Sequence, residues 1–475
     1  MVFSSMTFLF AFLPALLAVY FIVPPGKRNL RNGVLLLFSL LFYSCGGLRL
    51  LPILLSTVLL DYLFGRLASQ GRSPRVRKAA VWGAVLFGVG LLVWYKYIGF
   101  LTESLHALGL GIPVLKAVLP IGISFYTFAG LSYVIDVYRG EAKEEPNLLR
   151  LALYISLFPQ LMAGPIVRYG AVAADLAGRK ESLEHFSHGG MRFLFGLAKK
   201  MLLANQLAQI ADAAFGKPAG GLSVGLAWLG AAAYTGQIYF DFSGYSDMAI
   251  GLAELFGFRY PENFNYPYIS RSVTEFWRRW HISLSTWFRD YVYIPLGGNR
   301  VSRAKQVRNL LVVWLLTGLW HGAAWNFPAW GLYYALLLIG ERYLWGRALD
   351  RAPAVLRHAY ALVIITAGWV IFRSVGLGQA VSYLGVMFGG VRAALWDAQV
   401  TYCLMEFRWE LVIAVVAATP VKAWAEAFLK ARADKQVWAS FLVTWGASLL
   451  ALCLGFLSLM RLAQSGFTPF IYYQF

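Results

Sequence analysis

The chain has 475 residues, of which 59% are hydrophobic and 14% are charged, and its mean hydropathy is +0.60. Soluble domains are about 45 to 50% apolar and about 25% charged, so this composition excludes a soluble protein and predicts a polytopic, all-α membrane protein. The formal net charge of +19 does not indicate nucleic-acid binding, because the basic residues stand in short loops between apolar segments, as positive-inside membrane proteins place them.

Apolar stretches of about 17 to 25 residues, long enough to cross a bilayer, recur along the whole chain. Prolines and lysines interrupt two of them, near 149–166 and 189–211, so these are expected to re-enter or to lie flat, and about 11 true spans are expected in all. The candidates cover residues 7–24, 33–47, 50–67, 79–97, 117–137, 149–166, 189–211, 222–256, 308–327, 329–346, 355–376, 408–429 and 438–462.

The first apolar stretch reads as a retained helix, because no basic residue precedes it and no small-residue cleavage site separates it from Pro24 and Pro25. Basic loops at 27–31 and 66–78 are expected in the cytoplasm, which places the N-terminus outside. Three cysteines stand in or beside apolar segments without metal-ligand spacing, so we expect neither a disulfide framework nor a metal site.

No polar interval is long enough for a soluble domain, so residues 1–475 are interpreted as one membrane-embedded domain whose motif-bearing core covers about 115–345. Within the interval 257–308, a helical period predicts an amphipathic helix that carries Phe276 and Tyr291 on one arc and Arg278 on the other. Such a helix prefers an interface or a packed groove to a lipid-surrounded span.

Other polar side chains interrupt apolar stretches and are expected to support a polar site. Two prolines in FPQLMAGPIVR predict a re-entrant turn beside such a site, and acids at membrane depth are expected to pair with arginine or histidine or to line a cavity. A purely structural ion pair is an equal alternative for each acid. These supporting residues are Gln160, Arg168, Gln237, Asp241, Ser243, Asp247 and, further along, Asn326.

The run LTGLWHGAAWNF places a single imidazole, His321, in an apolar and aromatic stretch. An ionisable side chain at membrane depth persists mainly where it meets a partner or a watery cavity, and a neutral histidine is suited to general-base work near neutral pH. The structural alternative is an imidazole that bonds a backbone carbonyl between packed helices. Gly318 and Gly322 would let another helix or a thin substrate chain approach closely.

A second histidine, His281, lies at the border of the predicted apolar arc, where its ring can turn toward the protein interior. Its structural alternative is an interfacial histidine among Trp and Arg. The nearby Arg278, Arg279 and Arg289 can either anchor the chain to lipid phosphates or hold the phosphates of an anionic cofactor.

Several strings resemble the membrane-bound O-acyltransferase family, in particular its bacterial branch of alginate O-acetyltransferases. The resemblance runs from the N-terminus to about residue 345 and is generic beyond it. The strings are LPIGISFYTFAGLSYVIDVYRG, LFPQLMAGPIVR, QIYFDFSGYSDMAIGLAELFGF, FNYPYISRSVTEFWRRWHISLSTWFRDYVYIPLGGNR and LTGLWHGAAWNF.

The resemblance implies a ring of tilted helices around a thinned centre with a tunnel, an active histidine at His321 and a second family histidine at His281. It also implies an acyl donor that arrives from the cytoplasm, expected to be acetyl-CoA, with Trp280, Trp320 and the three arginines beside it. The acceptor is expected outside: an exopolysaccharide such as alginate, reached directly or through a partner protein. Teichoic acid and peptidoglycan are the acceptors of related branches.

The expected protein is therefore a multi-pass inner-membrane acetyltransferase with no permanently bound cofactor and no nucleic-acid partner. A transporter or flippase that moves a glycan or an acyl carrier without chemistry, with Asp241 and Asp247 in its polar path, is the alternative from another class. A scaffold for a separate enzyme is a third reading.

Overall fold

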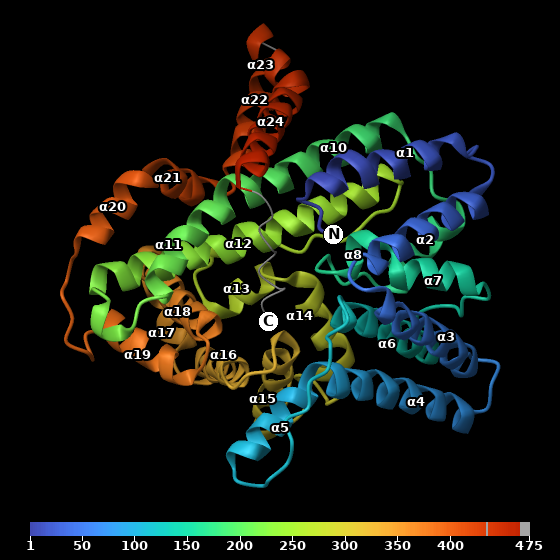
Figure 1. Cartoon of the computed structure of the whole chain (residues 1–475), viewed down its shortest axis with the longest axis horizontal. Coiled ribbons are helices and arrows are strands. Elements are labelled where there is room, and N and C mark those ends of the chain that lie inside the picture. Colours follow the sequence, from blue (N-terminus) through green and yellow to red (C-terminus); the bar gives the residue numbers. More distant parts are fainter. Residues whose placement is uncertain (434–435, 466–475) are drawn as a thin grey trace. The chain divides into compact units, whose positions relative to one another are not determined.

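The computed structural model describes residues 1–433 and 436–465, and every regular element within these residues is a helix, which confirms the predicted all-α class. The helices, labelled in Figure 1, form two compact units. Unit 1 consists of residues 1–193 and 246–261, and unit 2 of residues 194–245 and 262–475. That the whole chain is one membrane-embedded domain stays a prediction.

Unit 1 is built from the N-terminal helices, and α3 packs against α4, α6 and α7 within it. A cluster of phenylalanine rings that includes Phe8, Phe42 and Phe158 fills its interior. Its helices are α1 (Leu13–Ile22), α2 (Arg28–Ser44), α3 (Leu51–Ala68), α4 (Pro74–Leu92), α5 (Ile98–Ala107), α6 (Ile123–Arg139), α7 (Leu148–Ser156), α8 (Phe158–Leu161) and α9 (Tyr169–Gly178), with the first part of α10 (Leu183–Ala198) and the last part of α12 (Val224–Leu255).

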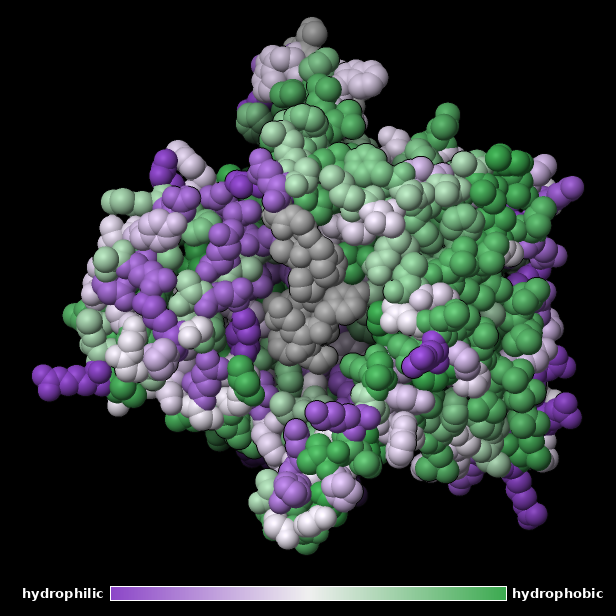
Figure 2. Space-filling model, viewed as in Figure 1, coloured by the Kyte–Doolittle hydropathy of each residue, from purple (hydrophilic) through white to green (hydrophobic). Residues whose placement is uncertain are grey.

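The outward face of unit 1 is apolar. Leucines on α2 and α3, among them Leu37, Leu41, Leu59 and Leu63, are exposed, and Figure 2 shows hydrophobic side chains over much of the visible surface of these helices. Contiguous exposed apolar surface of this extent is typical of lipid-facing helices rather than of soluble domains. The surface therefore agrees with the membrane character predicted from composition.

Four described helices are long and apolar enough to cross a membrane, or five if one bent pair forms a single span. The expected count of about 11 spans is not confirmed. Of the two stretches expected to re-enter or to lie flat, the one near 149–166 is interrupted, because α7 ends at Ser156, whereas the one near 189–211 stays helical, because α10 continues as a π-helical segment, Lys199–Ala204. The spans are Leu48–Ala68, Pro74–Ala107, Ala354–Arg373 and Ala447–Gln464, and the bent pair is Arg408–Ala417 with Val421–Arg432.

Unit 2 holds both histidines of interest and centres on the antiparallel pair α15 and α16, against which α13 and α18 pack. Its helices, with the remaining parts of α10 and α12, are α11 (Asn205–Phe215), α13 (Val273–Arg279), α14 (Ile282–Phe288), α15 (Arg303–His321), α16 (Asn326–Tyr343), α17 (Gly346–Arg351), α18 (Ala354–Arg373), α19 (Leu377–Met387), α20 (Ala398–Glu406), α21 (Arg408–Ala417), α22 (Val421–Ala433), α23 (Val437–Phe441) and α24 (Ala447–Ser465).

The predicted continuous helix through Phe276 and Tyr291 is wrong, because the chain breaks at Trp280 and His281. Trp280 is extended, with φ −100° and ψ 131°, and His281 is left-handed, with φ 43° and ψ 55°. The break separates α13 from α14, and a π-helical segment, Arg289–Tyr293, follows. The predicted apolar arc is nevertheless buried throughout: Phe276, Trp277, Trp280, Leu284, Trp287, Phe288 and Tyr291.

Candidate active site

His321 is the last residue of α15, where the chain turns back into α16. The two helices touch backbone to backbone, because a Cβ atom on Gly318 would lie 2.4 Å from the Phe327 carbonyl oxygen and one on Gly331 would lie 2.2 Å from that of Trp314. Only glycine permits such an approach. Gly318 was expected to let either another helix or a substrate chain approach closely, and the structure places helix α16 beside it.

The His321 side chain is surrounded by aromatic rings. It is 4% exposed, and its ring centroid lies 5.0 Å from that of Trp320, 5.1 Å from Trp330 and 5.2 Å from Phe372. Trp330 is on α16 and Phe372 on α18, so three elements fix the position of the imidazole. Packing of this kind restricts the ring to one orientation, which general-base chemistry requires.

His281 lies in the turn between α13 and α14 and is 1% exposed. Its ring lies 4.7 Å from Phe242 and 5.7 Å from Trp320, and neither ring nitrogen has a hydrogen-bond partner among the described residues. Burial lowers the pKa of His281 to about 3, so the imidazole is neutral at physiological pH. The expectation that His281 turns inward is confirmed.

Trp320 contacts the rings of both histidines. Two histidines that are far apart in sequence are thus joined through one indole in unit 2. An imidazole in its neutral form carries one donor and one acceptor nitrogen, so such a ring can accept a proton or donate a hydrogen bond.

The three arginines expected near a donor take separate roles. Arg279 donates to Glu275 Oε1 at 3.0 Å and to the Asn265 carbonyl at 3.1 Å. Arg289 is exposed and pairs with Asp290 at 2.7 Å, while Arg278 is exposed on α13. Trp280 is part of the aromatic core, where its ring lies 4.8 Å from that of Trp369.

The acids on α12 form ion pairs. Asp241 is buried and pairs with Lys200 at 2.8 Å, so the predicted arginine or histidine partner is wrong for this acid and the cation is a lysine. Asp247, in the part of α12 that belongs to unit 1, pairs with Arg192 at 3.0 Å. Both pairs favour the structural reading of these acids. Gln237 is half-buried and Ser243 buried on the same helix.

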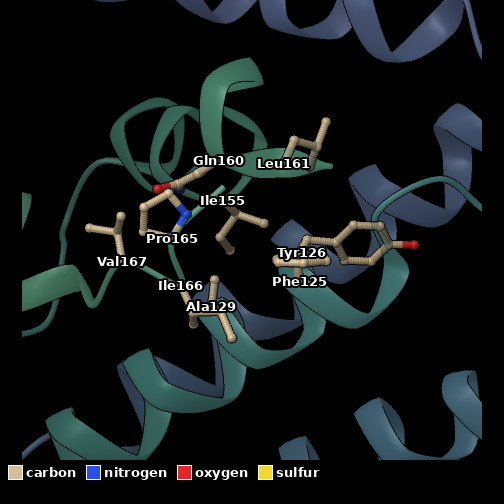
Figure 3. A pocket seen from close by; sticks show the side chains of 9 residues that line it. All are labelled: Phe125, Tyr126, Ala129, Ile155, Gln160, Leu161, Pro165, Ile166 and Val167. Atoms are coloured by element: carbon tan, nitrogen blue, oxygen red, sulfur yellow. The ribbon is translucent and has the colours of Figure 1, made fainter. Parts of the chain in front are cut away.

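Gln160 and Arg168 belong to unit 1, in the buried segment between α7 and α9 that the two prolines break. Gln160 donates a hydrogen bond to the Tyr154 carbonyl, and Arg168 directly precedes α9. Gln160 also lines a small hollow, shown in Figure 3. The other residues lining it are apolar or aromatic: Phe125, Tyr126, Ala129, Ile155, Leu161, Pro165, Ile166 and Val167.

Asn326 begins α16 and ties it to the end of α18. Its Nδ2 donates to the carbonyls of Phe372 at 3.2 Å and Ser374 at 3.0 Å. Since Phe372 contacts His321, Asn326 supports the site through this packing rather than by lining a polar passage. In the described residues, no group of three or more His, Cys, Asp or Glu side chains has the arrangement of a metal site.

Sequence reasoning missed two residues that position α13 and α14, the helices on either side of His281. Asn263 contacts α14 through its side chain and its carbonyl, and Glu341 on α16 accepts hydrogen bonds from the first amides of α13, Val273 N at 2.6 Å and Thr274 N at 2.8 Å. The pattern Ser272-Val-Thr-Glu275 is a capping-box signal that would have located the start of α13. Nothing in the sequence points to Asn263 or Glu341, because both act from distant segments.

The family model for the membrane-bound O-acyltransferase family matches residues 137–386, which include both histidines. The chain is 40% identical to a probable alginate O-acetylase of Azotobacter vinelandii and 40% identical to one of Pseudomonas putida, in each case over the full length of both chains. It is 33% identical to the peptidoglycan O-acetyltransferase of Helicobacter pylori, over 82% of this chain and 80% of that one.

Proposed function

Because the chain belongs to the membrane-bound O-acyltransferase family and is therefore an O-acyltransferase, we propose that it transfers acetyl groups to hydroxyls of an extracytoplasmic polysaccharide such as alginate. The donor is a cytoplasmic thioester, with acetyl-CoA as the expected compound. The protein lies in the inner membrane with its N-terminus outside, and the acetyl group reaches the polymer directly or through a partner protein.

One observation carries the proposal: His321 and His281, far apart in sequence, both contact Trp320 inside the region that matches the family. Buried imidazoles are rare among membrane-embedded helices unless they have a function. The full-length similarity to two alginate O-acetylases supports alginate or a related exopolysaccharide as the acceptor. The similarity to a peptidoglycan O-acetyltransferase supports peptidoglycan as the second candidate.

In the proposed reaction, neutral His321 removes the proton from an acceptor hydroxyl, whose oxygen attacks the thioester carbonyl carbon. The carbon–sulfur bond then breaks, and the departing thiolate takes the proton from the imidazolium, which leaves an ester and a free thiol. His281 donates a hydrogen bond to a reacting oxygen. Holding both substrates at one site supplies proximity, and the aromatic surroundings limit thioester hydrolysis.

The test is acetyl transfer by the purified protein in nanodiscs, with radiolabelled acetyl-CoA and oligosaccharides of alginate or peptidoglycan. His321→Ala is expected to lower transfer by about 10²-fold or more while the protein stays folded. His358→Ala is the matched control, because His358 is a half-buried histidine of unit 2 that bonds only the Ser270 carbonyl.

The same preparation separates this function from the alternatives. Radiolabel in the oligosaccharide, lost in His321→Ala and kept in His358→Ala, supports the acetyltransferase. Movement of intact donor or glycan across the membrane without acyl transfer supports a transporter. Wild-type acetylation by His321→Ala would overturn the role of His321 and favour a scaffold for another enzyme.

A further inference from the structure

The backbone at His281 has an unusual conformation. Only Tyr266 and His281 have a positive φ among the described residues other than glycine, at 44° and 43°. A left-handed conformation is uncommon for a residue with a side chain and persists where surrounding contacts enforce it. The contacts that enforce it at His281 come from one short segment, Asn263–Asn265, named here the clasp.

The clasp brackets the turn with two backbone hydrogen bonds. Asn265 N donates to the Arg279 carbonyl at 2.9 Å, just before the turn, and Ile282 N donates to the Asn263 carbonyl at 2.9 Å, just after it. Between them, the Phe264 ring lies 5.0 Å from that of Trp280 and 5.0 Å from that of Phe242. The clasp therefore fixes both the ends of the turn and the aromatic wall that the His281 ring faces.

Asn263 also replaces the side-chain cap that α14 lacks. A residue at the N-cap usually accepts hydrogen bonds from the next amides through its own side chain, but His281 makes no such bond. Instead Asn263 Oδ1 accepts from Ser283 Oγ at 2.9 Å and from Ser283 N at 3.3 Å. Because Asn263 caps α14, the His281 side chain is not used as a cap, and neither of its ring nitrogens has a hydrogen-bond partner among the described residues.

We propose that Asn263 is the positioning residue for His281: its carbonyl and side-chain oxygens hold the left-handed turn so that the imidazole faces Phe242 and Trp320 and neither of its nitrogens is hydrogen-bonded within the described residues. Asn263 is 1% exposed and contacts α14 rather than the imidazole, so it acts through the turn. The expected effect of Asn263 on acetyl transfer rests on the proposed function, whereas its expected effect on the position of the His281 ring does not.

The experiment compares Asn263→Ala with Asn263→Asp. Burial at this site favours the uncharged form of an aspartate, which keeps an oxygen that accepts from Ser283, so it is expected to rescue what alanine removes. Asn147→Ala is the matched control, because Asn147 caps α7 in unit 1 by accepting from Leu149 N at 2.9 Å and Arg150 N at 3.2 Å. Asn147→Ala therefore loses the same kind of bond away from His281.

Two readouts are measured on the full-length protein. The ring ¹⁵N resonances of the six histidines are recorded, with His281 assigned by its disappearance in His281→Gln, and kcat and KM for acetyl transfer are determined. Asn263→Ala is expected to shift the His281 resonances and to lower kcat by about tenfold or more, with KM within about threefold of the wild-type value. Asn263→Asp and Asn147→Ala keep wild-type resonances and kcat.

Unchanged His281 resonances in folded Asn263→Ala would overturn the positioning role, and so would a loss of kcat that Asn147→Ala matches. If Asn263→Ala does not fold, Ser283→Ala, which removes the 2.9 Å bond to Asn263 Oδ1, is measured in its place, and an unshifted His281 resonance counts against the role in the same way. If the wild-type protein transfers no acetyl group, the proposed function fails while the resonances still decide the inference.

Discussion

The ring centroids of His281 and Trp320 lie 5.7 Å apart, and the same indole lies 5.0 Å from the next residue in the chain, His321. The contact joins the turn between α13 and α14 to the end of α15. Each imidazole also packs against a ring from another helix, Phe242 for His281 and Phe372 for His321. Because the Trp320 indole contacts both imidazoles, the relative placement of the two histidines depends on it.

Replacing Trp320 should therefore impair catalysis more than folding. Trp320→Phe keeps an aromatic ring but widens the gap to His281, because a phenyl ring is smaller than an indole, and we expect acetyl transfer to fall by about tenfold, an effect worth about 1.4 kcal/mol. Trp314→Phe is the control, because Trp314 is buried on α15, where its ring packs against Trp277 and Trp330. Equal loss of kcat in both variants would contradict the special role of Trp320.

The close approach of α15 and α16 gives a prediction for stability. Alanine at Gly331 would place a Cβ atom 2.2 Å from the Trp314 carbonyl oxygen, so the helices must separate, at a cost of about 1 to 3 kcal/mol. Gly90→Ala in α4 is the control, because nothing lies within 4 Å of its added Cβ atom. Thermal unfolding in detergent measures both, and a Gly331→Ala midpoint as high as that of Gly90→Ala would refute the steric argument.

Composition and hydrophobic pattern predicted the membrane class and the all-α fold, because both depend on local sequence, whereas for His281 they left an interfacial and an inward-facing position open. The break at His281 was not predictable in this way. Its helical period continues through Trp280, and only hydrogen bonds from Asn263 and Asn265 impose the left-handed turn. Similarly, the depth of Asp241 in an apolar stretch predicted an arginine or histidine partner, whereas the fold brings Lys200 to it.

Removing one charge of the Lys200–Asp241 pair should destabilise the protein strongly, whereas removing both charges should destabilise it little. Lys200→Met takes away the ammonium 2.8 Å from Asp241, and breaking a buried pair costs about 3 to 5 kcal/mol. The double variant Lys200→Met with Asp241→Leu removes both charges and should recover most of that loss. A double-mutant cycle of unfolding midpoints measures the coupling. Additive losses in the double variant would show that the pair contributes no specific stabilisation.

The proposed orientation can be checked with a native cysteine. Cys45 is exposed at the end of α2, after the first basic loop, so an N-terminus outside places it on the extracytoplasmic side. In a background with Cys403→Ala and Cys453→Ala, a membrane-impermeant maleimide should label Cys45 in intact spheroplasts. Labelling only after the membrane is permeabilised would show the opposite orientation.

Acid should weaken unit 1 through Glu181. Its carboxylate accepts from Arg28 Nη1 at 2.5 Å and lies 3.0 Å from Arg31 Nη1, and Tyr20 donates to it as well. Burial acts to raise the pKa, but the hydrogen bonds from Arg28 and Tyr20 outweigh it and lower the pKa of Glu181 from 4.5 to about 2. The carboxylate therefore contributes its full stability above about pH 4.5 and loses it as the pH falls through about 2.

Glu181→Gln should accordingly be less stable than the wild-type protein at pH 6, by up to about 3 kcal/mol, and the difference should shrink progressively between pH 4.5 and pH 2. Glu184→Gln, which changes an exposed acid at the start of α10, serves as the control and should match the wild-type protein throughout. Unfolding midpoints measured along this pH series decide the matter. A difference between Glu181→Gln and the wild-type protein that stays constant down to pH 2 would mean that the ionised carboxylate does not hold Arg28 and Arg31 in place.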